Sequence, residues 1–106
     1  MTLSALKTLL ESAMPGKVVY LAWPEKEAPA LPYVCYLESD SDNFAADNIV
    51  YHARKKVQIE LYSKYKDPTS EALIENALTS AGIFYESTDT YLEDEKCHER
   101  IYTIEV

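Results

Sequence analysis

Residues 31–106 decide the fold, and they read LPYVCYLESDSDNFAADNIVYHARKKVQIELYSKYKDPTSEALIENALTSAGIFYESTDTYLEDEKCHERIYTIEV. Short β-branched and aromatic runs in this stretch predict strands, and one capped amphipathic run predicts a helix. The stretch carries no arrangement of residues that a catalyst needs. A small α+β unit without a catalytic arrangement of residues indicates a protein that functions through assembly.

The strands are predicted from alternation. In the central run, Val57, Ile59 and Leu61 alternate with polar or aromatic neighbours, which is typical of a half-buried antiparallel sheet. Residues 49–62 are expected to form one long strand, or two strands that share a bend. The other expected strands of this stretch cover residues 33–38, 83–91 and 100–106. The charged residues 92–99 between the last two strands are expected to form a turn.

The helix between these strands has clear boundaries. Asp67 is a suitable N-cap, and Pro68 fits the first helical position because its missing N–H has no partner there. Gly82 is a suitable C′ residue. The expected apolar face comprises Leu73, Ile74, Ala77, Leu78 and Ala81.

The first 32 residues add one helix, one strand and a connector. Leucines at helical spacing follow Thr2, a plausible N-cap, and Pro15-Gly16 ends the helix near residue 14. Residues 17–22 predict a strand. Three prolines in residues 23–32 favour an irregular, stiff connector. The whole chain, residues 1–106, is therefore expected to be a single α+β domain of order α-β-β-β-α-β-β. Its two helices are expected on one face of a mainly antiparallel sheet.

The chain is strongly acidic, with a formal net charge of −8. Sequence-specific binding to DNA or RNA is not expected, because phosphate binding needs a positive surface. The acidity serves solubility, or it repels nucleic acid, as would suit a ring through which DNA slides. No run is long enough to span a bilayer, and the amphipathic N-terminus differs from a signal peptide. We expect a soluble, intracellular protein without a membrane partner.

Cysteines and histidines offer no recognisable site. Cys35 and Cys97 are expected to be reduced, packed thiols, although a disulfide between them stays open. A zinc site with His52 and His98 lacks the usual ligand spacing, and adjacency places Cys97 and His98 on opposite sheet faces. A Cys–His nucleophile would also need a glycine-rich turn, which the sequence lacks.

Two groups of acidic residues suggest chemistry that their context does not support. One holds potential calcium ligands: Asp40, Asp42, Asn43 and Asp47. A calcium loop starting at Asp40 would need a ligand at Phe44, Gly at Ala45 and Glu at Tyr51, so a capped turn is expected instead. The other group is expected to be a solvated turn: Glu93, Asp94, Glu95 and Glu99. We therefore predict no catalytic, cofactor-binding or metal site, and no enzyme.

The nine tyrosines are the other unusual feature. Most of them fall on or beside the predicted strands, which agrees with ordinary sheet propensity. Some could instead line subunit interfaces, where amphipathic aromatic side chains are favoured.

Three segments resemble a family of small proteins from prophages of Gram-positive bacteria. They are LPYVCY (31–36) followed by DNFAADN (42–48), then VQIELYSKYKDP (57–68), then EALIENALTSAGIFYESTDTYLEDEK (71–96) ending in IYTIEV (101–106). With the first helix and WPEKEAP (23–29), the resemblance covers essentially the whole chain. The family looks like phage tail terminators or tail-completion proteins, which have an α+β fold and close into hexameric rings.

The resemblance implies a structural role in virion assembly without catalysis. Such a ring would cap the tail tube and join tail to head, in the cytoplasm of the bacterial host and then in the virion. Its partners would be the phage tail tube protein and head–tail connector proteins. A connector or stopper of the same joint is an alternative, as is an acidic regulatory module. The expected contact residues are Asp42, Asn43, Phe44, Asp47 and Tyr51.

Overall fold

The computed structural model describes residues 1–41 and 55–106, and it confirms the predicted α+β class. The elements occur in the predicted order. They are α1 (Leu3–Ala13), β1 (Val18–Tyr20), β2 (Tyr33–Ser41), β3 (Lys55–Ser63), α2 (Pro68–Ser80), β4 (Tyr85–Leu92) and β5 (Cys97–Glu105).

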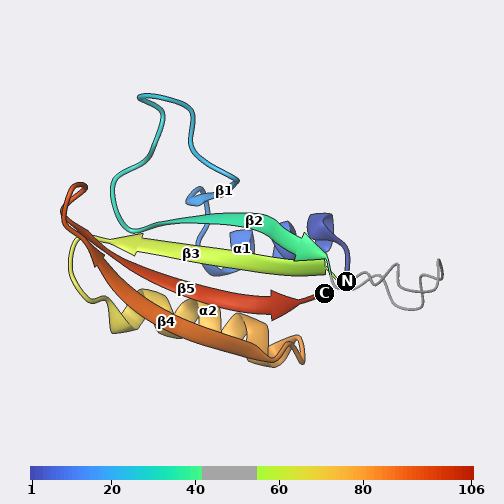
Figure 1. Cartoon of the computed structure of the whole chain (residues 1–106). Coiled ribbons are helices and arrows are strands. Elements are labelled where there is room, and N and C mark those ends of the chain that lie inside the picture. The colour runs from blue at the N-terminus through green and yellow to red at the C-terminus, as the bar shows by residue number, and fades with distance from the viewer. Residues whose placement is uncertain (42–54) are drawn as a thin grey trace.

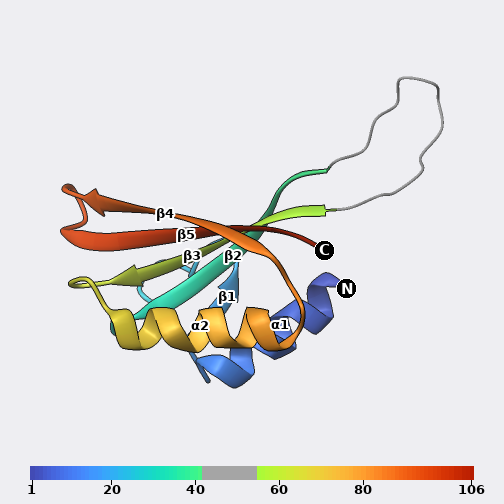
Figure 2. The ribbon, with the colours of Figure 1, turned by 90° about the horizontal axis from the view of Figure 1, so that it is seen from below.

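The five strands form one mixed sheet in the order β1-β2-β3-β5-β4. Only β1 and β2 pair in parallel, so the sheet is mainly antiparallel, as predicted. Both helices lie on the same face of this sheet (Figures 1 and 2). The strand β4 lies at one edge, and the short β1 lies at the other.

The core lies between the helices and the sheet. Alternate residues of β3 point into it, since Val57, Ile59 and Leu61 are almost completely buried, as their spacing predicted. The helices contribute one stripe each. The fully buried side chains of the core are Leu6, Leu10, Val34, Val57, Ile59, Leu61, Ile74, Leu78, Tyr102 and Ile104.

The predicted apolar face of α2 is partly wrong. Leu73 is 45% exposed and Ala81 is exposed, whereas Glu71 is buried in line with Ile74 and Leu78. The Glu71 carboxylate lies 3.0 Å from Lys66 Nζ and 3.7 Å from Arg100 Nε, so its buried charge has two cationic partners. A paired carboxylate therefore lies in the interface, where the sequence pattern placed Leu73.

The predicted ends of α2 are confirmed. The Asp67 carboxylate accepts a hydrogen bond from the Ser70 N–H at 3.1 Å, and Pro68 takes the first helical turn. At the other end the Gly82 N–H donates to the Thr79 carbonyl and the Ile83 N–H donates to the Leu78 carbonyl. This is a Schellman motif, and Gly82 has the positive φ of 72° that it requires.

The turn predicted over residues 92–99 is much shorter in the structure. The strand β5 begins at Cys97, so only residues 93–96 connect it to β4. Cys97–Glu99 extend the ladder because they pair with β4, and His98 and Glu99 pair also with β3. Backbone pairing on both sides outweighs the charged character of these residues.

Other strand boundaries shift by a few residues. The first strand spans three residues rather than 17–22, and Leu21 follows it with a φ of 69°. The second continues to Ser41 across a register shift between Glu38 and Asp40, and the predicted 83–91 strand runs from Tyr85 to Leu92. Residues 49–54 of the predicted long strand lie outside the described residues. Connector residues 23–32 form no helix or strand, as predicted, and residues 21 and 22, predicted to be in the first strand, are irregular as well.

Candidate functional site

All five predicted contact residues fall in a part of the chain that the structure does not describe. These residues are Asp42, Asn43, Phe44, Asp47 and Tyr51. His52, considered above for zinc, lies there too. The described residues offer three other regions with functional character: an open sheet edge, a cluster of charged side chains and a half-buried face behind the sheet.

The open edge is the strand β4. Its eight residues pair continuously with β5 on one side, and no other described strand pairs with them on the other side. The strand contains no proline and no register shift. Natural proteins usually protect long edges with such features, so β4 is able to accept a further strand.

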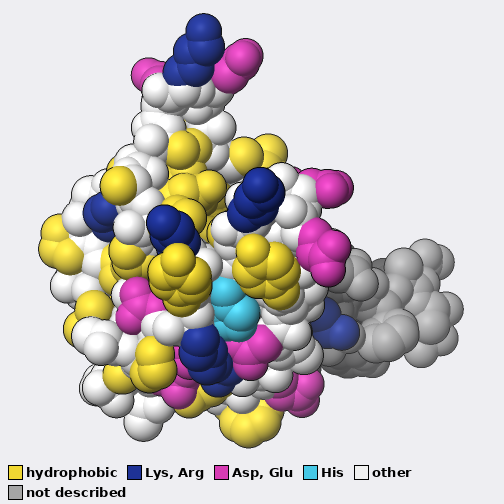
Figure 3. Space-filling model, turned by 90° about the vertical axis from the view of Figure 1, so that its left-hand side faces the viewer, with side chains coloured by type: hydrophobic (Ala, Val, Ile, Leu, Met, Phe, Trp, Pro, Cys, Tyr) yellow, Lys and Arg dark blue, Asp and Glu magenta, His cyan; other side chains and the backbone are white. Residues whose placement is uncertain are grey.

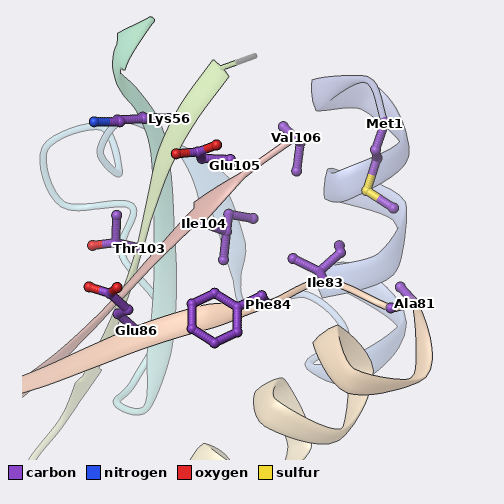
Figure 4. A pocket seen from close by; sticks show the side chains of 11 residues that line it. Met1, Lys56, Ala81, Ile83, Phe84, Glu86, Thr103, Ile104, Glu105 and Val106 are labelled. Carbon is purple, nitrogen blue, oxygen red and sulfur yellow. The ribbon is translucent and has the colours of Figure 1, made fainter. Parts of the chain in front are cut away.

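A hollow lined by both apolar and polar residues, here called the Phe84 hollow, lies where β4 begins. It has a volume of about 630 Å³, and Figure 4 shows Phe84 and Ile83 where the chain enters β4, with Met1 beside α1. Phe84 is 80% exposed and Met1 is 52% exposed. The lining residues are Met1, Lys56, Ala81, Gly82, Ile83, Phe84, Glu86, Thr103, Ile104, Glu105 and Val106. Phenylalanine is among the side chains enriched in protein interfaces, so Phe84 is a candidate contact for a protein partner.

The second region, the charge cluster, is defined as Lys66, Glu71, Glu75, Asp89, His98 and Arg100. Arg100 lies at its centre and is only 15% exposed. Its guanidinium lies 2.7 Å from Asp89 Oδ2 and 3.4 Å from Glu75 Oε2. It also donates to the hydroxyl of Ser87 at 3.0 Å. These contacts join α2 to β4 and β5.

Two tyrosines connect the charge cluster to the core. The Tyr102 hydroxyl donates to Glu75 Oε2 at 2.8 Å and accepts from Arg100 Nε at 3.0 Å. The Tyr85 hydroxyl donates to the other Glu75 oxygen at 3.2 Å. Burial, followed by the hydrogen bond to Glu75, raises the pKa of Tyr102. Tyr102 therefore remains a neutral donor in this network.

The outer part of the cluster holds Lys66 and His98 around Asp89. Asp89 Oδ1 lies 3.3 Å from Lys66 Nζ and 3.1 Å from His98 Nε2. Burial alone would raise the pKa of Asp89, but the hydrogen bonds from Arg100 and Lys66 outweigh it and lower the pKa. Figure 3 shows the histidine between acidic and basic side chains at this end of the molecule, with hydrophobic side chains beside it.

The third region is the face of the sheet opposite the helices. Connector residues partly cover it and border an open cavity of about 480 Å³. Both cysteines line this cavity, and both are free and buried, so the disulfide that the sequence left open is not formed. Burial is the main cause that raises the pKa of Cys35, to about 11. Cys35 is therefore a protonated, unreactive thiol at neutral pH.

Glu99 also lies on this face, and its predicted exposure is wrong. It is only 9% exposed, because it is part of β5 rather than of the turn, whereas Glu93, Asp94 and Glu95 are exposed as predicted. Burial, and then the neighbouring Glu99 charge, raise the pKa of Glu60. The two carboxylates share Tyr62, which donates to Glu60 Oε1 at 3.2 Å.

None of these three regions brings a nucleophile to a general base. Cys97 and His98 point to opposite faces of the sheet, as their adjacency predicted: Cys97 lines the cavity and His98 contacts Asp89. Glu71, Asp89 and His98 are the only possible metal-ligand group among the described residues. No sequence pattern predicted this group or the Phe84 hollow.

Comparison of the chain with protein-family models, with curated proteins and with solved structures finds no match in any of the three. In residues 1–41 and 55–106, no helix combines the length and apolar character needed to cross a bilayer.

Proposed function

We propose that this protein is a structural subunit of a bacteriophage tail, which forms the ring that caps the tail tube and joins it to the head. The proposal starts from the resemblance of the sequence to tail terminators. The open edge of β4 with the exposed Phe84 at its start is the structural observation that carries it. Both features are suited to a protein partner.

The proposed mechanism is geometric. Identical chains that associate head to tail close a ring when the rotation between neighbours divides the circle, and the resemblance implies six subunits. In this arrangement β4 of one subunit accepts backbone hydrogen bonds from its neighbour, and Phe84 packs into an apolar surface beside that contact. One face of the ring meets the tail tube protein and the other meets the connector proteins.

The acidic composition fits this role in two ways. A net charge of −8 lets DNA pass without binding to the ring. It also opposes self-association at low ionic strength, so the ring forms on the tail as a template. Assembly takes place in the cytoplasm of the bacterial host, and the ring remains in the virion.

The test is deletion of the gene from the lysogen that carries it, followed by electron microscopy of the induced lysate. We expect free filled heads beside unattached tails of irregular length, because nothing stops the growth of the tube. Heads that leak DNA beside tails of uniform length would instead assign the protein to the connector or stopper. Normal virions would contradict both phage roles and favour the acidic regulatory module.

A further inference from the structure

We propose that Glu71, Asp89 and His98 form a binding site for one divalent cation of the zinc class, and that Lys66 occupies the cation position until the ion displaces it. This inference is independent of the proposed tail function. It concerns the outer part of the charge cluster, where α2, β4 and β5 meet.

The three residues form a suitable set of ligands for zinc. Each of the three residues offers one ligand atom, and these atoms all lie within 4.8 Å of one another. Zinc with bonds of about 2.0–2.1 Å holds its ligand atoms about 3.4 Å apart, so small side-chain rotations close the site. The 3.1 Å between His98 Nε2 and Asp89 Oδ1 already agrees with that spacing. One imidazole and two carboxylates favour zinc over calcium or magnesium, which prefer oxygen ligands alone.

Lys66 marks where the cation lies. Its Nζ lies 3.0 Å from Glu71 Oε2 and 3.3 Å from Asp89 Oδ1, so an ammonium already bridges both carboxylates. The Lys66 side chain is 52% exposed, and it comes from the segment between β3 and α2. A long, half-exposed side chain can leave the site, and Asp89, at 39% exposed, leaves a path for the ion from solvent.

The charge balance supports exchange of the ammonium for a divalent ion. The cluster holds three carboxylates, Glu71, Glu75 and Asp89, against the permanent charges of Arg100 and Lys66. With a neutral His98, the net charge of the cluster is −1, from three negative and two positive charges. Replacement of the ammonium by a divalent ion brings the net charge to zero, which favours binding of the ion in this partly buried cluster.

Polar atoms without a hydrogen-bond partner lie in and beside the cluster. Ser63 Oγ and His98 Nδ1 are buried and have no such partner among the described residues. Glu71 Oε2 is held by Lys66 Nζ at 3.0 Å, so it would lose its partner when the ammonium leaves. Ser63, 3% exposed, is the cross-strand partner of His98. Such atoms are rare in folded proteins, so the cluster keeps polar capacity that its own side chains do not fill once Lys66 withdraws.

The test uses the full-length protein freed of metal and titrated with zinc chloride by calorimetry. We expect one zinc per chain, and at least about tenfold weaker binding in Asp89→Asn and in His98→Gln. Glu86→Gln is the matched control, because this carboxylate is on the same strand but faces away from the cluster, and it should bind as the wild type does. Cobalt bound at the site should give visible absorption that Asp89→Asn abolishes.

Lys66→Met gives a test that does not depend on removal of a ligand. It keeps the apolar stem and removes only the competing ammonium, so zinc should bind more tightly than to the wild type. Unchanged or weaker binding in this variant would overturn the displacement step. No zinc uptake by the wild type, or full binding by a folded Asp89→Asn variant, would overturn the site; the latter result would point to the thiols or His52.

Discussion

Tyr102 is the residue at which the core and the charge cluster meet. It is fully buried, and its ring packs edge-to-face on Tyr85 with 5.5 Å between the ring centroids. Its hydroxyl has two charged partners, Glu75 and Arg100. Hydrogen bonds to charged groups contribute more than neutral ones, and a buried charged group that loses its partner is destabilising.

Tyr102→Phe should therefore lower the free energy of unfolding by about 1–3 kcal/mol. The substitution keeps the ring and removes only the hydroxyl between Glu75 and Arg100. Tyr85→Phe is the matched control, because it removes a longer 3.2 Å hydrogen bond to the same Glu75 from a less buried ring. Urea unfolding of both variants measures the difference. Equal effects of the two substitutions would contradict the role given to Tyr102.

Glu60 lowers the free energy of unfolding as the pH rises, whereas a carboxylate in an ordinary ion pair raises it. Its pKa in the folded protein is above the usual value of 4.5, so the folded state holds the proton more tightly than the unfolded chain does. Glu60 stabilises the folded protein fully below pH 4.5, and this stabilisation is lost as the pH rises through the pKa of Glu60 in the folded state. The Glu60→Gln variant has no carboxylate to ionise, so it avoids this loss, and its amide oxygen still accepts the Tyr62 hydrogen bond.

The expected result is a melting temperature for Glu60→Gln above that of the wild type at pH 7, by on the order of 2–5 °C. The difference between the two proteins should shrink toward pH 4.5. Thermal unfolding across this range measures it, with the exposed Glu86→Gln as control. A difference that does not change with pH would show that Glu60 is not the titrating group.

At the scale of elements, the C-terminal end of α2 determines how β4 enters the sheet. Gly82 has a φ of 72°, and a Cβ added there would meet no atom within 4 Å. A substitution at this position therefore tests backbone conformation alone, without a steric clash. The left-handed conformation costs an L-residue about 1–2 kcal/mol.

Gly82→Ala should reduce the free energy of unfolding by about 1–2 kcal/mol for this reason. Gly82→Asn should recover part of the loss, because asparagine tolerates the left-handed region better than alanine does. Chemical denaturation of the three proteins gives the comparison. If alanine is tolerated as well as glycine, the Schellman motif does not hold the end of the helix in solution.

The elements that the sequence predicted correctly are those with local signals. The Asp67-Pro68 start and the Gly82 end of α2 follow from the chemistry of single residues, and alternation predicted the buried face of β3. The errors at Leu73 and Glu99 arise from partners far away in the chain. Glu71 is buried beside Lys66 and Arg100 while Leu73 faces outward, and Glu99 is buried in the strand that pairs with Tyr62.

The charge cluster was missed for the same reason, since its members come from α2, β4, β5 and the segment before α2. Two signals could have indicated it. Glu71 and Glu75 are four residues apart, which places them on one helix face. His98 and Arg100 share the alternation of Tyr102, which places them on the face of the sheet that meets the helices. Only the pairing of β4 with β5 adds Asp89 to this group.

For the molecule as a whole, the two ends of the sheet differ in chemistry. The charge cluster lies toward the end where β4 turns into β5, whereas the Phe84 hollow lies toward the end that holds both termini (Figure 1). An association between identical chains that uses the open β4 edge brings Phe84 into the contact, because Phe84 immediately precedes that strand. The proposed assembly therefore depends on this side chain.

The most direct measurement is the length distribution of tails in lysates of the gene-deletion lysogen complemented with Phe84→Asp. Leu73→Asp, at an exposed leucine on α2, is the control for an added charge. We predict unattached tails of irregular length for Phe84→Asp, as for the deletion, and normal virions for Leu73→Asp and for the wild-type gene. Normal virions from a Phe84→Asp protein made at the wild-type level would contradict the account.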